Sequence, residues 1–271
     1  MKKFNKIIDY ANLDKDLKSK FLNNNPFPFI ILDNFLKNDF FTQLSKSLIS
    51  EELSLNKVFN SSVEKKKISL NTEIPYLVKM LVEELSSEEW LSFIKDLTDI
   101  DDIFPADLDN TKLANYHTMT GGGYLGPHVD HSHDPKTYHP HVLNVIVYLS
   151  AKWDDDFKGA TLFYDENGKN VINKALYKPN RAVVFLHTPY TFHGVEKIPE
   201  TVNLERSIVY LDYYSKSLTP YKHMKLNFKN HWFRHGTTFV LAKMSDYLKK
   251  QNVPYLKSYL RYKFKKFVSI N

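Results

Sequence analysis

A histidine and an aspartate lie two residues apart at His128 and Asp130, directly after the glycine-rich stretch 121–127. On a β-strand, residues i and i+2 point to the same face, about 6–7 Å apart. An imidazole and a carboxylate held in this way are two of the three ligands of a 2-His-1-carboxylate site, which binds Fe(II). A chain with eleven histidines will contain a His-x-Asp by accident, so the rest of the sequence must supply the third ligand.

His193 is the candidate for that third ligand, because it lies in a second short strand-like segment, 191–195. Arg206 then follows inside the otherwise apolar run 206–214. A guanidinium that faces the interior of a β-barrel needs an anionic partner, since an unpaired buried charge is very costly. Arginine also matches the geometry of a carboxylate. We therefore expect an acidic ligand near Arg206.

The elements that position these residues are predicted from the change in hydrophobic period near residue 112. Alternating or continuous apolar segments, rich in β-branched and aromatic residues, predict strands at 113–119, 141–149, 159–164, 181–186, 191–195 and 206–214, with a turn at 165–168. Many strands joined by short turns, without helices between them, are typical of an antiparallel sandwich or jelly roll. The mouth of such a barrel brings inward-facing residues of distant strands together.

The first 110 residues are predicted to be mainly helical, with one early strand. Helices are expected within 1–24, at 39–50, at 74–85 and after a capping box formed by Ser86 and Glu89; the strand is expected at 29–32. Residues 51–73 are polar and lysine-rich, and no element is predicted there. Two more helices are expected near 238–250 and 255–268. The fold class is thus mainly β with flanking helices.

Composition limits the class of protein. Hydrophobic residues make up 42% and charged residues 25%, as in ordinary globular domains. The absence of cysteine excludes disulfides, thiolate metal sites and thiol nucleophiles. The N-terminus has lysines but lacks the apolar region of a signal peptide, and no apolar run is long enough to span a bilayer. A cytoplasmic location is expected.

Positive charge is concentrated at the C-terminal end, where residues 222–271 contain 12 lysines and arginines and one acidic residue. A predicted helix from Pro254 carries an apolar stripe, which favours packing on the barrel over the alternative of a membrane-surface helix. The stripe is formed by Tyr255, Leu256, Tyr259, Leu260, Phe264, Phe267 and Val268. Nucleic acid is not expected as a partner, because the segment has no recognisable binding motif.

Several motifs together resemble the 2-oxoglutarate- and Fe(II)-dependent oxygenases of the prolyl 4-hydroxylase-like group. They are the opening segment 27–36, the His-x-Asp at 128–130, the strand 143–149 with Trp153, the segment Gly159-Ala-Thr-Leu-Phe, Phe192-His-Gly-Val195 and Arg206-Ser. The resemblance implies a double-stranded β-helix (jelly roll) in a single oxygenase domain, 1–271. Within it we expect a helical N-terminal region (1–110), the jelly-roll core (111–216) and basic C-terminal helices (217–271).

The resemblance also implies roles for individual residues. His128, Asp130 and His193 would hold Fe(II), Arg206 would bind the distal carboxylate of 2-oxoglutarate, and O2 would take the remaining position. The implied reaction is hydroxylation of an unactivated C–H bond in a peptidyl-proline or small-molecule substrate, with succinate and CO2 as co-products. Two weaker cofactor candidates are Asn144, which we expect to face the barrel interior, and Tyr116. The family commonly has a tyrosine at the position of Met119, and Tyr116 is a candidate substitute for it.

Three alternatives remain open at this point. The chain could be a non-catalytic jelly-roll module that binds metal, a cupin-type metalloenzyme, or a hydroxylase of a sugar or lipid-linked metabolite. The intact ligand set favours an enzyme over a binding module, and Arg206 argues against a cupin. Four further histidines, His131, His133, His139 and His141, follow the His-x-Asp motif. We interpret them as solvated loop residues in preference to a second metal site. The sequence does not indicate an oligomeric state.

Overall fold

The computed structural model describes residues 6–13, 16–50, 57–60, 64–69, 74–107, 116–131, 134, 137, 139–188, 190–216 and 239–240. The helices are η1 (Tyr10–Asn12), α1 (Leu17–Asn23), α2 (Asn38–Ser50), α3 (Tyr76–Glu84), α4 (Glu88–Thr98) and η3 (Asp155–Phe157). The strands are β1 (Phe29–Leu32), β2 (Lys57–Asn60), β3 (Glu64–Ser69), β4 (Ile103–Pro105), β5 (Tyr116–Met119), β6 (Tyr124–Val129), β7 (His141–Tyr148), β8 (Thr161–Tyr164), β9 (Val171–Ala175), β10 (Ala182–Leu186), β11 (His193–Val195), β12 (Arg206–Ser215) and β13 (Phe239–Val240).

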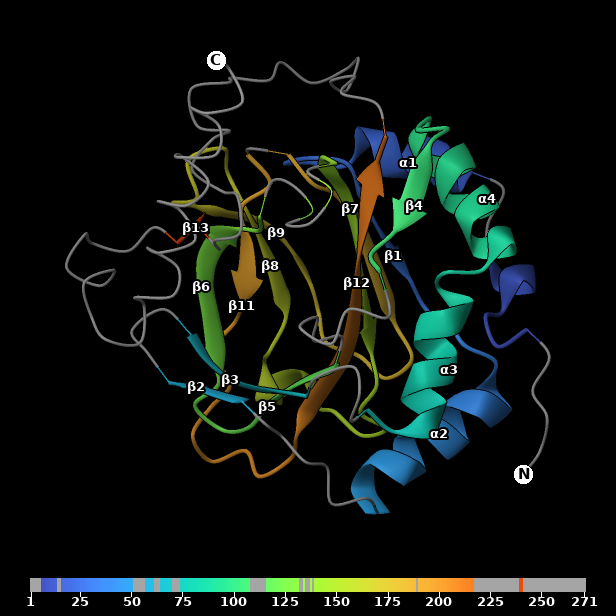
Figure 1. Ribbon diagram of the computed structural model, residues 1–271. Helices are drawn as coiled ribbons and strands as arrows, with labels where there is room; N and C mark the ends of the chain where they lie inside the picture. Colours follow the sequence, from blue (N-terminus) through green and yellow to red (C-terminus); the bar gives the residue numbers. More distant parts are fainter. Residues whose placement is uncertain are drawn as a thin grey trace.

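The described strands form one antiparallel sheet that folds over on itself, in the order β1-β10-β7-β12-β5-β3-β6-β11-β8-β9. The strands β1, β10, β7, β12 and β5 form one layer, and β6, β11, β8 and β9 form the facing layer (Figure 1). Strand β3 connects the layers, because Lys67 pairs with Thr118 in β5 and Glu64 pairs with Leu125 in β6. This is the jelly-roll architecture that the sequence predicts.

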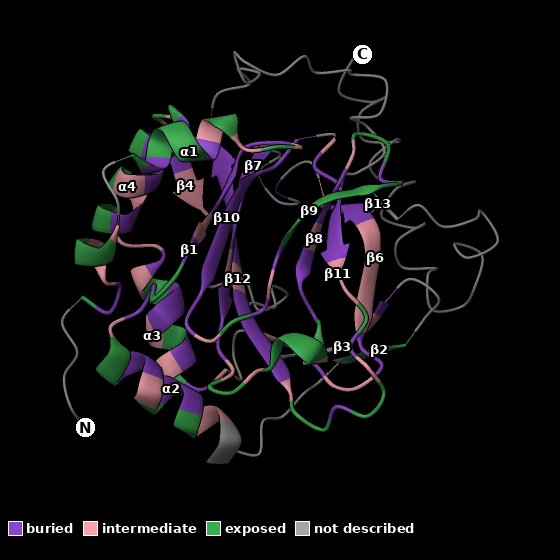
Figure 2. Ribbon diagram, turned by 180° about the vertical axis from the view of Figure 1, so that it is seen from behind, coloured by how far each residue is buried: buried purple, intermediate pink, exposed green. Residues whose placement is uncertain are grey.

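The long strand β12 divides its side chains between two environments, as the period of two requires. Val209, Leu211 and Tyr213 are fully buried on the face that packs against the helices. Ile208 and Asp212 belong to the other face, which lines the space between the layers. The helices α1 to α4 cover the first layer from outside, and the strands beneath them are the most buried region of the fold (Figure 2).

The helix α4 begins one residue later than predicted. The Oγ of Ser87, and not of Ser86, accepts a hydrogen bond from the backbone N–H of Trp90 at 3.3 Å. Ser86 instead closes the preceding turn, where its hydroxyl donates to the carbonyl of Val82. The predicted capping box is therefore wrong in register, because the last turn of α3 extends through Leu85. Trp90, on the buried face of α4, is fully enclosed.

Most predicted strands and helices are present, with three differences. The polar segment 51–73 contains the hairpin of β2 and β3, and the short strands β4 and β9 were not predicted. In β9 the first four residues are exposed, so the segment has no apolar face to signal a strand. The predicted C-terminal helices near 238–250 and 255–268 lie outside the described residues, apart from Phe239–Val240, which pair as β13 with β6.

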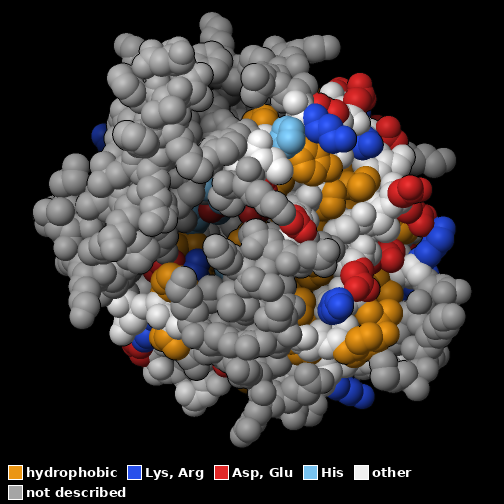
Figure 3. All heavy atoms as spheres, viewed as in Figure 1, with side chains coloured by type: hydrophobic (Ala, Val, Ile, Leu, Met, Phe, Trp, Pro, Cys, Tyr) orange, Lys and Arg blue, Asp and Glu red, His pale blue; other side chains and the backbone are white. Residues whose placement is uncertain are grey.

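The outer surface carries charges of both signs. On the side of the helices, acidic and basic side chains are interspersed along the edge of the molecule (Figure 3). Among the described residues, no helix combines the length and apolar character that crossing a membrane requires.

Candidate active site

His128 and His193 are brought together by strand pairing. His193, the first residue of β11, lies directly opposite His128 of β6 in the antiparallel register. Their ring centroids are 4.2 Å apart. The pairing needs a glycine next to His193, because a Cβ at Gly194 would lie 2.6 Å from the carbonyl oxygen of Leu125. The close approach of the two backbones thus explains the glycine of the Phe-His-Gly segment.

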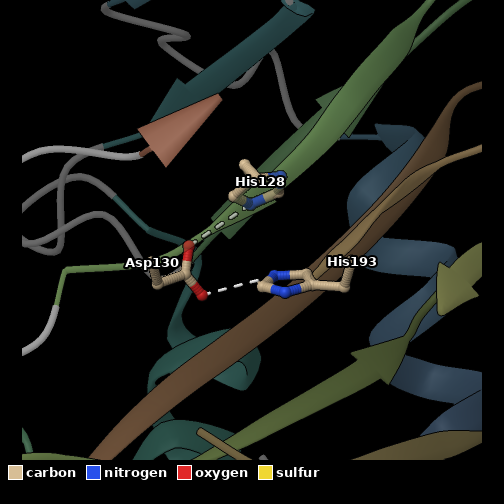
Figure 4. A group of neighbouring side chains, drawn as sticks. All are labelled: His128, Asp130 and His193. Atoms are coloured by element: carbon tan, nitrogen blue, oxygen red, sulfur yellow. Dashed lines mark ion pairs between the residues drawn. The ribbon is translucent and has the colours of Figure 1, made fainter. Parts of the chain in front are cut away.

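Asp130 completes a three-residue cluster between the two rings. It follows the last residue of β6, and its Oδ1 and Oδ2 each lie 3.3 Å from an imidazole Nε2, of His128 and His193 respectively (Figure 4). All three ligand atoms lie within 4.8 Å of one another. Both histidines are buried, whereas the Asp130 side chain is 23% exposed. The structure therefore brings the three predicted ligand residues to one point.

Backbone carbonyls orient both rings of the cluster. The Nδ1 of His128 lies 2.9 Å from the carbonyl oxygen of Gly126, and the Nδ1 of His193 lies 3.0 Å from that of Thr191. With Nδ1–H donated to these carbonyls, the Nε2 of each ring faces Asp130, where it can hydrogen-bond the carboxylate when protonated and bind a metal ion when deprotonated. Ligand histidines in metal sites usually donate their second ring nitrogen in this way.

The protonation equilibria of the cluster are coupled. Burial lowers the pKa of His128, and the nearby His193 lowers it further. Burial alone would raise the pKa of Asp130, but the charge of His193 and the hydrogen bond with His128 hold it well below its usual range. Burial alone would lower the pKa of His193, and the Asp130 carboxylate raises it. The carboxylate thus stays ionised, as a metal ligand must be.

Arg206 is held rigidly at the start of β12. Its Nε donates to the carbonyl oxygen of Gly159 at 2.6 Å, and its guanidinium carbon lies 5.3 Å and 4.8 Å from the ring centroids of Tyr148 and Tyr177. The residue is 1% exposed, and burial lowers its pKa. Its Nη2 is buried and has no hydrogen-bond partner among the described residues.

One cavity of about 140 Å³ contains both the three-residue cluster and Arg206. It lies between the two layers, and its wall includes Asn144 and Thr161 from β7 and β8. The Nδ2 of Asn144 donates to Oδ2 of Asp130 at 3.3 Å. Asn144 therefore faces the interior, as expected, and it contacts the proposed ligand Asp130.

Tyr116 does not reach this cavity, so the structure does not support it as a cofactor residue. It alternates with His117 and Met119, which line the cavity, and so it lies on the opposite face of β5. Its hydroxyl donates to Oγ of Ser207 at 3.1 Å, within the core beneath the helices. Tyr116 and Met119 are three positions apart on β5. Because side chains alternate between the two faces of a strand, Tyr116 points away from the cavity that Met119 lines.

Two residues of the site were missed in the sequence, Tyr177 and Asp212. Tyr177 flanks Arg206 together with Tyr148, whose hydroxyl is hydrogen-bonded to Thr161 Oγ1 at 2.7 Å. Asp212 lies on the inward face of β12, six positions after Arg206, and lines the cavity. Its even spacing from Arg206 is a sequence signal that could have identified it.

The histidines after Asp130 also differ from the prediction. His141 is 3% exposed at the start of β7, and His131 is partly buried and stacked on it, with ring centroids 5.0 Å apart. The interpretation as solvated loop residues is wrong for His141, because its place in the paired strand β7 buries it. His139 is partly exposed, and His133 lies outside the described residues.

Asp212 and the two histidines form a second polar group beside the first. The distances from Asp212 to the Nε2 atoms of His131 and His141 are 3.7 Å and 3.4 Å. Burial raises the pKa of Asp212 to about 7 and lowers the pKa of both histidines.

A family model matches part of the chain, and solved structures share its fold. Residues 111–211 match the family model of the 2OG-Fe(II) oxygenase superfamily. No curated protein matches the chain by sequence. A prolyl-4-hydroxylase of Pseudomonas putida superposes with a TM-score of 0.52 at 13% identity, over 74% of this chain and 100% of its own.

Two further solved structures are similar. A prolyl hydroxylase of Trichoplax adhaerens, in complex with a hypoxia inducible factor peptide, has a TM-score of 0.50 at 17% identity, over 74% of this chain and 89% of its own. HygX of Streptomyces hygroscopicus, with nickel, 2-oxoglutarate and hygromycin B bound, has a TM-score of 0.50 at 12% identity, over 84% of this chain and 96% of its own. At these identities the likeness shows a shared jelly-roll fold.

Proposed function

Because residues 111–211 belong to the 2OG-Fe(II) oxygenase superfamily, we propose that His128, Asp130 and His193 hold its Fe(II) ion and that Arg206 binds the distal carboxylate of 2-oxoglutarate. The chain is a 2-oxoglutarate-dependent dioxygenase. The proposed reaction is hydroxylation of a C–H bond in a peptidyl-proline or a polar small molecule.

The observation that best supports this assignment is the buried guanidinium of Arg206. Its Nη2 is buried and has no hydrogen-bond partner in the described region of the chain, in the wall of the cavity that also contains the three-residue cluster. A buried donor of a charged group is costly when it is left without a partner. A carboxylate accepts from a guanidinium with matching geometry. The distal carboxylate of 2-oxoglutarate fits this requirement, and the cluster offers ligand atoms for the metal.

With Fe(II), 2-oxoglutarate and O2 bound, a site of this class couples oxidative decarboxylation, which yields succinate and CO2, to hydroxylation of the substrate. The residues of this chain bind and orient. Main-chain carbonyls fix the rings of His128 and His193, and Asn144 fixes the Asp130 carboxylate. Two tyrosine rings fix the Arg206 guanidinium. The two layers of strands bound the cavity on two sides.

A polar substrate is supported by the rest of the cavity wall. Besides the proposed ligands and Arg206, the wall includes the polar side chains of Lys66, His117, His131, Tyr210 and Asp212. Two structural neighbours are named as prolyl hydroxylases, and one was solved with hygromycin B. We therefore propose two substrate classes for testing, namely prolyl peptides and small molecules that carry hydroxyl or amino groups, such as sugars.

The test is succinate formation from 2-oxoglutarate with Fe(II), measured against panels of prolyl peptides, amino acids and sugars. Mass spectrometry would identify the product that has gained one oxygen atom. His193→Ala should reduce turnover by more than about 100-fold. Substitution of a residue that only hydrogen-bonds a metal ligand already costs about 10–100-fold, and loss of a ligand should cost more. His139→Ala is the matched control, since its ring contacts Phe104 and Thr137 outside the cluster.

The alternative of a non-catalytic binding module makes a different prediction. Such a module would bind Fe(II) through the same residues but form no succinate with any substrate or without one. That result, obtained with metal-loaded protein, would reject the proposed hydroxylase.

A further inference from the structure

A second group of side chains that can bind metal lies beside the first and is not among the proposed ligands of Fe(II) or 2-oxoglutarate. His131 follows Asp130 directly, His141 begins β7, and Asp212 is on β12, the strand paired with β7. One ligand atom from each residue lies within 4.8 Å of the other two. The three residues thus meet at one point, and two of them, His131 and Asp212, also line the cavity.

Two distances within this group are close to the spacing of metal ligands. The Asp212 oxygens lie 3.4 Å and 3.7 Å from the Nε2 atoms of His141 and His131. Ligands at 2.0–2.2 Å from a tetrahedral ion are about 3.3–3.6 Å apart. A direct imidazolium–carboxylate hydrogen bond would be shorter, about 2.7–2.9 Å. If the three residues instead surrounded an ammonium group, such as that of a ligand, their acceptor atoms would be about 4.4–4.7 Å apart, because hydrogen bonds of 2.7–2.9 Å are longer than metal bonds.

The ring of His141 is oriented like the rings of the first cluster. Its Nδ1 lies 3.0 Å from the carbonyl oxygen of His131, which matches the carbonyl contacts of His128 and His193. The Nε2 of His141 also lies 3.2 Å from the carbonyl oxygen of Leu143. A neutral imidazole has one N–H, and the shorter contact is at Nδ1. With the proton on Nδ1, the Nε2 that faces Asp212 has a lone pair available to a metal ion.

Asp212 is a buried carboxylate, and one of its two oxygens lacks a donor among the described residues. Its side chain is 3% exposed, and its Oδ1 accepts no hydrogen bond from the described residues. A buried carboxylate is stable only when it is neutralised, paired or bound to a metal. A cation bound between Asp212 and the two imidazoles would satisfy this requirement. The His131 side chain is 22% exposed, so the group is open to the solvent on that side.

We propose that His131, His141 and Asp212 form a second site for a divalent cation, separate from the Fe(II) site. Two imidazoles and a carboxylate suit Zn(II). The hydroxyl of Tyr214 lies 2.8 Å from Nε2 of His131, and this hydrogen bond is exchanged for the metal bond when the ion binds. The ion joins the segment after Asp130 to β7 and β12, and so fixes one wall of the substrate cavity.

The test counts Zn(II) per chain in full-length protein that has been stripped with a chelator, re-equilibrated with Zn(II) and gel-filtered. Wild type and the control His139→Ala should hold two ions. His141→Ala and His193→Ala should each hold one, and the double variant should hold none. Circular dichroism checks that each variant is folded. If His141→Ala is not, the partly exposed His131→Ala replaces it and should lose the same ion.

The two sites fail separately in this experiment. The second site is overturned if the variants at His141 and His131 bind as much Zn(II) as wild type. The assignment of the first cluster is overturned if His193→Ala loses no ion. A wild-type chain with one ion that only His193→Ala removes would show that the second group is a hydrogen-bonded network without metal.

Discussion

The Nε of Arg206 donates a hydrogen bond to the carbonyl oxygen of Gly159 at 2.6 Å, across 47 positions of the sequence. Gly159 leaves no spare space for a side chain, because a Cβ there would lie 3.1 Å from Cδ of Arg206. Its φ of +75° is also one that other residues rarely adopt. The place of the guanidinium therefore depends on a glycine that lies two residues before strand β8.

Gly159→Ala should weaken both folding and cosubstrate binding. We expect a loss of about 1–3 kcal/mol in the free energy of unfolding from the backbone conformation, together with a higher KM for 2-oxoglutarate because Arg206 is displaced. Gly168→Ala is the matched control, since Gly168 has a φ of +68° in the turn between β8 and β9. It should be destabilised without a change in KM. Equal KM values in the two variants would contradict this account of Arg206.

Arg206→Ala should reduce the affinity for 2-oxoglutarate by about 2–5 kcal/mol, the usual cost of truncating one partner of a buried charge pair. Fe(II) affinity should change little, because Arg206 is not a proposed ligand. Isothermal titration calorimetry with the metal-loaded protein measures both quantities. Ser207→Ala changes the neighbouring residue, whose hydroxyl faces the helical side of the sheet, and should leave the affinity unaltered. An unchanged affinity in Arg206→Ala would place the anchor elsewhere.

Tyr213→Phe should destabilise the fold without affecting catalysis. The Tyr213 hydroxyl accepts from Nε1 of Trp90 at 2.8 Å and donates to the carbonyl of Leu85 at 2.6 Å, at a fully buried position. Removing it leaves a buried donor and acceptor without partners, which costs about 1–3 kcal/mol. Urea unfolding measures this loss. Tyr76→Phe, at a position that is 57% exposed, should cost almost nothing.

The raised pKa of Asp212 predicts that the stability of chelator-treated protein depends on pH. Its pKa is raised from 3.8 to about 7 on folding, so the folded state binds the proton more tightly than the unfolded chain. The contribution of this group to stability is therefore present at low pH and is lost as the pH rises from about 4 to 7, by up to about 1.4 kcal/mol per unit of pKa difference. Asp212→Asn should flatten this region of the unfolding curve. Parallel curves for variant and wild type would contradict the raised pKa.

The jelly roll could be predicted because its central strands are continuous apolar segments. The strands β7, β10 and β12 are buried along almost their entire length, so their sequences differ clearly from the turns around them. The segment of β3, by contrast, contains three consecutive lysines, and its pairing with β5 and β6 depends on backbone hydrogen bonds. Such a strand has no apolar pattern to identify it.

The proposed ligands were found in the sequence because His128 and Asp130 are close in the chain and His193 has a distinctive neighbourhood. The surroundings of Arg206 could not be found in the same way. Tyr177 and Gly159 contact it from segments whose position depends on how the whole sheet curls. The group of His131, His141 and Asp212 could not be predicted for the same reason. The register of the strands sets the distances between these residues, and no local sequence motif indicates them.

The oxygens that orient His128 and His193 belong to the main chain of Gly126 and Thr191. No substitution of a side chain can delete such an oxygen, as it could if a carboxylate or amide performed the task. The orientation of the two rings therefore requires no further polar side chain, only the strand pairing that Gly194 permits. Residues of the cavity wall that bind neither the metal nor the cosubstrate can then diverge toward new substrates without disturbing the rings.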